Sequence, residues 1–145
     1  NYYGELIKNS SNIKYHGFII PGGKKFNELA AECSFVVFHS AAESCATSVT
    51  TCMRAGLVPI INKWTSIIVE KGCVEISEDG DLIQNITNMI NMAATMDRED
   101  YQQNVNSILE KSKVFSEKSL QNLLPPVVEA FIIRRGLYRS NGNGN

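Results

Sequence analysis

The sequence has few of the residues that bind structural metals or build a disulfide framework. Only two histidines, His16 and His39, occur among its 145 residues, and neither is spaced to complete a zinc site with the cysteines. The four cysteines show no CxxC spacing; they are Cys33, Cys45, Cys52 and Cys73. The sequence therefore predicts no bound metal, and the favoured interpretation of the cysteines is reduced thiols in a cytoplasmic protein.

Long apolar runs and an excess of charge are also missing. No run approaches the roughly 20 residues of a membrane-spanning helix. The N-terminal stretch NYYGELIKNS does not combine a basic segment with an apolar one, as a signal peptide does. With 14 basic and 15 acidic side chains, the formal net charge is −1, so no overall field favours nucleic acid as a partner.

One local cluster of charge, formed by Arg134, Arg135 and Arg139, follows an apolar segment near the end of the chain. Two interpretations remain open. The arginines either form a solvated helix end that complements the helix dipole, or they give the full-length protein a peripheral contact with a membrane surface.

What the sequence does contain is an alternation of apolar runs and helical patterns over the length of one domain. Residues 34–39 (SFVVFH) are apolar without alternation, which is typical of a strand buried on both faces of a parallel sheet. A helix is expected from about Ala46 to Ala55, with Gly56 as its C-terminal glycine, followed by the buried strand LVPII. This pattern predicts a strand, a crossover helix and a parallel strand.

Other segments extend the alternation. Strands are predicted over residues 12–18 (NIKYHGF) and 73–76, and helices over residues 3–9, 26–33, 82–93, from Asp97 onward and from Ser116 onward. Pro125 and Pro126 interrupt the last helix, and residues 139–145 form an apolar-free tail that we expect to be disordered. The chain is predicted to be an α/β protein with a Rossmann-like parallel sheet flanked by helices.

The candidate site is the segment from Ser40 to Thr47, because ligands bind at the carboxyl ends of parallel strands. The following helix would direct its free N–H groups there, which suits a phosphate, and the small side chains from Ser44 to Thr47 allow close approach. The alternative is that Ser44 or Thr47 merely caps the helix. Glu43 would repel an anion, so it fits either a neutral, hydroxyl-rich part of the same ligand or a solvated loop.

Several stretches resemble one family. HGF at 16–18, then FNELAAECSF, FHSAAES, SVTTCMRAGLVPI and DLIQNITNMI together resemble the C-terminal donor-binding domain of glycosyltransferase family 4 (group 1) enzymes, from about Asn12 to Phe131. The resemblance implies one half of a GT-B fold, in which two Rossmann-like domains face a cleft. It also implies transfer of a sugar from a nucleotide-diphosphate sugar, with retention and without a metal or other cofactor, in glycan, polysaccharide or glycolipid biosynthesis.

The resemblance also assigns roles to residues. Glu43 matches the first of the family's paired glutamates and would contact the donor sugar near its anomeric carbon. The backbone of the next four residues would hold the diphosphate. The donor-binding residues implied in this way are Gly17, Phe18, Ser40, Ser44, Cys45, Ala46, Thr47 and Thr51.

The sequence departs from the family at several of these positions. Thr51 stands where a second glutamate usually takes the ribose hydroxyls, and threonine is a weaker acceptor than a carboxylate. Ser44 replaces a glycine, His39 replaces a proline, and Thr65 and Ser66 replace paired glycines. A divergent enzyme, or a non-catalytic nucleotide-sugar-binding or assembly module, is expected from these changes.

The family's Arg and Lys that neutralise the leaving diphosphate have no match in this chain. The resemblance therefore implies that residues 1–138 are a donor-binding domain truncated at its N-terminal side, inactive without the acceptor domain of the same protein. The segment NLLPPVVEAFII would either return to that domain or pack on its own sheet. An epimerase or another GT-B-like enzyme is a third hypothesis.

Overall fold

The computed structural model describes residues 2–44, 46–67 and 72–115, which are built around a three-stranded parallel sheet. The strands follow one another in the order β1 (Phe35–Phe38), β2 (Val58–Ile61) and β3 (Val74–Glu75). Phe35 lies opposite Val58 in the first pair, and Ile60 lies opposite Val74 in the second. The predicted parallel unit and the predicted third strand are confirmed.

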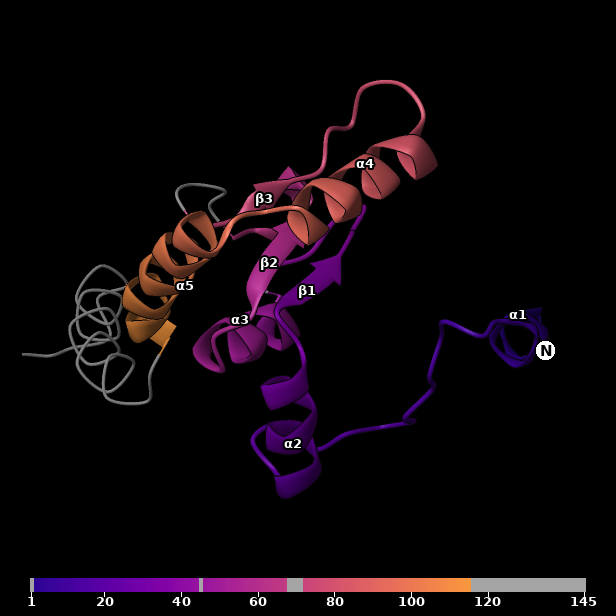
Figure 1. The fold of residues 1–145 in the computed structure, drawn as a ribbon, viewed down its shortest axis with the longest axis horizontal. Coiled ribbons are helices and arrows are strands. Elements are labelled where there is room, and N and C mark those ends of the chain that lie inside the picture. Colours follow the sequence, from indigo (N-terminus) through magenta and orange to yellow (C-terminus); the bar gives the residue numbers. More distant parts are fainter. Residues whose placement is uncertain (1, 45, 68–71, 116–145) are drawn as a thin grey trace, which may run out of the picture.

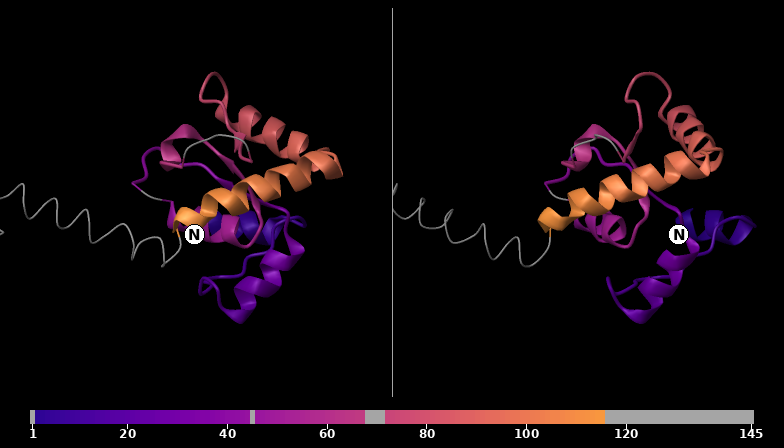
Figure 2. Two further views of the ribbon diagram at one scale, coloured as in Figure 1. Left: turned by 90° about the vertical axis from the view of Figure 1, so that its left-hand side faces the viewer. Right: turned by 60° about the vertical axis from the view of Figure 1, so that its left-hand side comes forward.

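Helices flank this sheet, as the α/β pattern predicts, in an arrangement compatible with a Rossmann-like fold. The α-helices are α1 (Tyr2–Asn9), α2 (Lys24–Glu32), α3 (Thr47–Arg54), α4 (Leu82–Ala94) and α5 (Arg98–Ser112), and the short 3-10 helices are η1 (Lys63–Thr65) and η2 (Lys113–Phe115). Helices α3 and α5 pack against β2 and against each other, and α4 packs against β3 (Figures 1 and 2). None of the helices in the described part of the chain is both long and apolar enough to cross a membrane.

The hydrophobic core lies between β2 and these helices. All four residues of β2 are buried, and α3 adds Val49 and Met53 while α5 adds Ile108. Each fully buried aliphatic side chain of this kind contributes about 1.5–3 kcal/mol relative to exposure. Tyr101 of α5 also donates a hydrogen bond to the Ser34 carbonyl (3.3 Å), which fixes α5 to the start of β1.

A proline occupies the central strand, where a missing N–H usually breaks a ladder. In β2 the amide of Val58 donates to the Ser34 carbonyl on the β1 side (2.9 Å), so the nitrogen of Pro59 faces the β3 side. Strand β3 pairs with β2 only from Ile60 onward. Pro59 is therefore tolerated because no described strand pairs with β2 at its nitrogen.

The helix boundaries coincide with local capping signals. Asp81 and Asp97 cap α4 and α5, each accepting a hydrogen bond from the amide three residues later (2.8 Å in both cases). Gly56 ends α3 with φ +88°, the left-handed conformation that suits glycine. The ends predicted at Asp97 and Gly56 are confirmed, and the cap at Asp81 is an addition from the structure.

Two predictions about strands are wrong. Residues 12–18 form no strand, and Ile13, Tyr15 and Phe18 are 54%, 73% and 89% exposed. A strand needs a neighbour to satisfy its N–H and C=O groups, and no described strand lies beside this segment, which runs from α1 toward α2 away from the sheet (Figure 1).

The burial of β1 on both faces is the second wrong prediction. Val37 is 45% exposed and the other three residues of β1 are half-buried, so the described residues do not fully cover this edge strand. Helix α2 likewise has no fully buried side chain, although its predicted apolar face is half-buried at Phe26, Leu29 and Ala30. The helix predicted from Ser116, its interruption at Pro125 and Pro126, the arginine cluster and the tail over residues 139–145 lie outside the described residues.

Candidate functional site

Three loops meet at the carboxyl edge of the sheet, and Asn62 joins them. Asn62 directly follows β2 and is completely buried. Its Nδ2 donates to the Ser40 carbonyl (2.7 Å) and to Oε1 of Glu78 (2.5 Å), and its Oδ1 accepts from the Ser40 amide (3.2 Å). One side chain thus fixes Ser40, in the loop after β1, to the segment that follows β3.

His39 and Glu78 lie beside this junction. Nε2 of His39 is 3.6 Å from Oε1 of Glu78, and both side chains are about one quarter exposed. That nitrogen is buried and has no hydrogen-bond partner among the described residues. In the family resemblance, His39 is only a residue that replaces a proline. In the structure, its ionisable ring belongs to the residue directly before Ser40.

The loop that carries Glu43 is held by its backbone and leaves its carboxylate unused. The amide of Glu43 donates to the Trp64 carbonyl (3.1 Å), and the Ser66 hydroxyl donates to the Glu43 carbonyl. Ser66 adopts the left-handed conformation, with φ +57°, at the end of η1. The Glu43 side chain is half-buried and makes no ion pair or hydrogen bond with any residue of the described ranges.

Helix α3 begins immediately after this loop, and its N-terminus has no side-chain cap. Ala46, at the N-cap position, offers no oxygen for the first turn, and that turn contains no acidic residue. Helices α4 and α5, by contrast, are both capped by aspartates. Among the described residues, the amides of Thr47, Ser48 and Val49 therefore have neither a side-chain cap nor an intrahelical acceptor, an arrangement that suits an anion. The alternative that Ser44 or Thr47 caps the helix is not supported by the hydrogen bonds of this turn.

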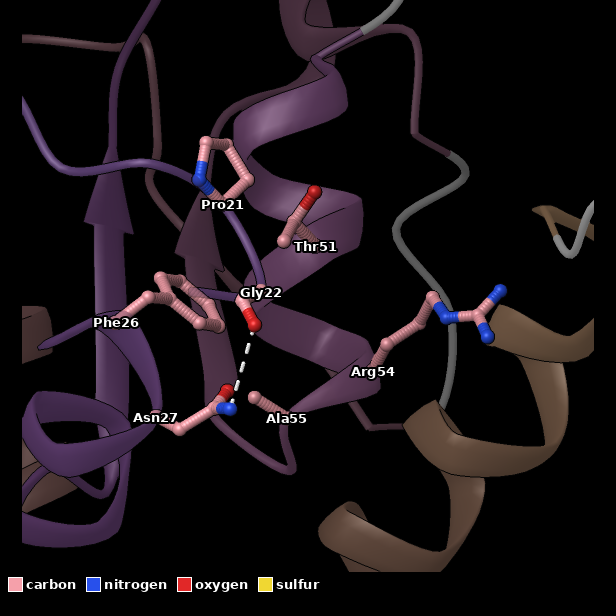
Figure 3. Close-up of a pocket in the computed structure, with 7 residues that line it drawn as sticks. All are labelled: Pro21, Gly22, Phe26, Asn27, Thr51, Arg54 and Ala55. Atoms are coloured by element: carbon pink, nitrogen blue, oxygen red, sulfur yellow. Dashed lines mark hydrogen bonds between the residues drawn. The ribbon is translucent and has the colours of Figure 1, made fainter. Parts of the chain in front are cut away.

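Thr51 lies one turn further along α3, in a different setting. It lines a cavity of about 420 Å³ between α3 and the start of α2, together with Pro21, Gly22, Phe26, Asn27, Arg54 and Ala55. Its hydroxyl donates to the Thr47 carbonyl (2.8 Å), so its proton is already used. Figure 3 shows the ring of Phe26 beside Gly22, and the guanidinium of Arg54 directed away from Phe26 and Asn27.

The structure brings together only part of the predicted site. Ser40, Glu43, Ser44, Ala46 and Thr47 lie on the one loop and helix start after β1. Cys45 lies outside the described residues. Gly17 and Phe18 belong to the irregular segment before α2, where Phe18 is almost fully exposed. They are not part of the Glu43 loop, and they are not among the residues that line the Thr51 cavity.

Two residues of the junction, Asn62 and Glu78, are absent from the sequence predictions. Each had a signal: Asn62 is the first polar residue after the apolar strand LVPII, and Glu78 follows the strand around Val74. Polar residues at such positions collect at one edge of a parallel sheet.

The site offers no metal centre, since no group of three or more His, Cys, Asp or Glu side chains forms one within residues 2–44, 46–67 and 72–115. Comparisons with protein-family models, with curated proteins and with solved structures find no match to this chain.

Proposed function

We propose that this chain is the donor-binding half of a retaining glycosyltransferase that takes its sugar from a nucleotide-diphosphate sugar. The observation that supports this most is the position of Glu43. A half-buried carboxylate without a partner among the described residues, on a loop fixed at Trp64 and Ser66, stands directly before a helix N-terminus that has no side-chain cap there. A carboxylate beside free amides suits a ligand in which sugar hydroxyls adjoin a phosphate.

In this proposal the two subsites act on different parts of the donor. Glu43 accepts hydrogen bonds from the sugar hydroxyls, and the amides from Thr47 to Val49 bind the diphosphate. When the glycosidic bond to phosphate breaks, negative charge grows on the leaving diphosphate, and the fixed amide dipoles of α3 stabilise it. The acceptor and its activating groups belong to the other domain, so the isolated chain should bind donor weakly and turn over nothing measurable.

Calorimetry on the full-length protein tests the sugar subsite. We expect Glu43→Ala to weaken binding of the cognate nucleotide sugar by about 10- to 100-fold, because hydrogen bonds to a charged group contribute about 1.5–3 kcal/mol. Binding of the nucleoside diphosphate alone should not weaken, since Glu43 does not serve the phosphate. Glu32→Ala, an exposed change at the end of α2, is the matched control. Equal losses for both ligands, or intact turnover, would contradict the assignment.

One observation favours the alternative, a non-catalytic nucleotide-sugar-binding or assembly module. Thr51, at the position of the second family glutamate, donates its hydroxyl proton to its own helix and offers no carboxylate. If ribose binds in this cavity, Thr51→Glu should tighten nucleotide binding by about tenfold, because a carboxylate accepts hydrogen bonds from the ribose hydroxyls. This gain in affinity should disappear for a deoxyribose analogue of the nucleotide.

A matched control for that variant lies on α4. The hydroxyl of Thr87 donates to the Ile83 carbonyl (2.8 Å) in the same way, and Thr87 is exposed. Thr87→Glu should leave nucleotide affinity unchanged. A wild-type protein that binds nucleotide sugar without turning it over, and gains affinity but no activity from Thr51→Glu, would establish the module.

A further inference from the structure

Trp64 is held beside Glu43 by the backbone of the two loops. The amide of Glu43 donates to the Trp64 carbonyl (3.1 Å), and the carbonyl of Glu43 accepts from the Ser66 hydroxyl. Both backbone polar groups of Glu43 are thus bonded to the short segment that carries Trp64. This segment is itself anchored, since buried Thr65 donates to the carbonyl of buried Asn62 (3.0 Å). Glu43 and Trp64 therefore belong to one fixed unit at the carboxyl edge of the sheet.

The Trp64 side chain is not part of the core. Trp64 is 49% exposed, although tryptophan has more apolar area to bury than most residue types. None of the described residues accepts a hydrogen bond from its indole N–H. The Lys63 ammonium lies over the ring, 4.9 Å from the centroid, and this cation–π contact favours one orientation of the indole. A half-exposed aromatic ring next to a carboxylate is typical of a ligand site, where apolar surface and a few polar groups meet.

A pyranose ring carries the two kinds of group that Glu43 and Trp64 can bind. One face of the ring consists mainly of C–H groups, which bury apolar area against the electron-rich face of an indole. The rim carries hydroxyls, which donate hydrogen bonds to a carboxylate. A diphosphate has no C–H face, and its charge would be repelled by Glu43.

We propose that Trp64 is the platform on which the donor sugar stacks, so that the donor is a nucleoside diphosphate linked to a pyranose. This inference rests on the proposed function and adds to it the ring form of the sugar and a residue that selects it. Glu43 binds the hydroxyls at the rim of the sugar, the Trp64 indole covers its C–H face, and the amides from Thr47 to Val49 bind the diphosphate.

The only tryptophan of the sequence is Trp64, so one indole N–H signal in a nitrogen–proton correlation spectrum reports on it alone. The 145-residue chain is titrated with UDP-glucose, UDP-galactose and GDP-mannose, and separately with UDP and GDP. We expect the nucleotide sugars to move the indole signal and the amide signals of Thr47 to Val49. UDP and GDP should move the same amides and leave the indole in place.

The outcomes separate this inference from the proposed function. An indole signal that stays in place with every nucleotide sugar, while the amides of Thr47 to Val49 shift, overturns the stacking and leaves donor binding intact. Equal movement of the indole with UDP and with UDP-glucose also overturns it, because Trp64 would then contact the nucleotide. Amides that respond to none of the compounds overturn the proposed function, and the stacking with it.

Calorimetry on variants tests whether the aromatic face is what matters. Trp64→Leu should weaken binding of the nucleotide sugar that moves the indole most by about tenfold, and it should leave binding of the nucleoside diphosphate unchanged. Trp64→Phe keeps an aromatic face and should retain most of the affinity. Tyr15→Leu, at an exposed aromatic residue outside the Glu43 loop, is the matched control and should change neither ligand's affinity. Equal losses for both ligands, or equal affinities of the Leu and Phe variants, would contradict stacking on Trp64.

Discussion

At the scale of single residues, two polar side chains at the carboxyl edge of the sheet differ in their hydrogen bonding. Asn62 is buried and uses both N–H groups and its carbonyl oxygen on Ser40 and Glu78. Glu43 is half-buried and has no partner in the described ranges. A satisfied buried amide stabilises the loops, whereas the carboxylate of Glu43 gains no such stabilising contact from the described residues.

Replacement of Asn62 by alanine should therefore be costly. Asn62→Ala leaves the amide and carbonyl of Ser40 without their partner in a part-buried setting, and we expect a loss of about 2–4 kcal/mol of unfolding free energy in urea. Asn91→Ala, on the exposed side of α4, should stay within about 0.5 kcal/mol of wild type. A loss as small for Asn62 as for Asn91 would show that the three loops are held by other contacts.

At the scale of elements, the helices differ in how their ends are satisfied. Asp81 and Asp97 cap α4 and α5, while α3 begins at Ala46 without a cap. The core still holds α3 through Val49 and Met53. Packing thus stabilises α3 without a cap, and among the described residues no side chain caps its first amides.

The cap of α5 provides a direct measurement. Asp97→Ala should lower the unfolding free energy by about 1 kcal/mol, because the amide of Asp100 loses its acceptor. Asp97→Asn keeps a capping oxygen and should restore most of that loss. Chemical denaturation of the three proteins checks this, and equal destabilisation by both changes would implicate the charge rather than the cap.

Alanine substitutions at two glycines with positive φ would separate the cost of backbone strain from the cost of a packing clash. A Cβ at Gly56 (φ +88°) would meet no atom within 4 Å, so Gly56→Ala should cost only about 1–2 kcal/mol of conformational strain. A Cβ at Gly72 (φ +98°) would lie 2.9 Å from Cγ2 of Ile108 and 3.0 Å from the backbone oxygen of Asn104. Gly72→Ala must displace α5 as well, and it should unfold at a clearly lower urea concentration than Gly56→Ala.

At the scale of the whole molecule, the buried side chains are concentrated around β2. The strand is buried along its length, whereas α1 stands apart from the sheet (Figure 1). Hydrogen exchange should show slow amides at Val58, Ile60 and Ile61 and fast amides in α1, since an eight-residue helix that stands apart from the sheet is marginal in water. Protection in α1 as strong as in β2 would mean that α1 packs on the sheet in solution.

The sequence by itself determined the features that depend on neighbours along the chain. The apolar runs of β1 and β2, the aspartate caps and Gly56 follow from contacts within a few residues, so pattern and propensity predict them. The strand predicted over residues 12–18 failed because a strand depends on a partner that its own pattern does not specify.

Only the tertiary structure decided which of these elements form a site. Asn62 reaches Ser40 across 22 positions and Glu78 across 16, and no local signal contains those pairings. The same is true of Thr51, which the fold places opposite Phe26 rather than beside Glu43. Such contacts are set by how the strands and helices pack, because burial of the shared core, and not local sequence, brings distant polar groups together.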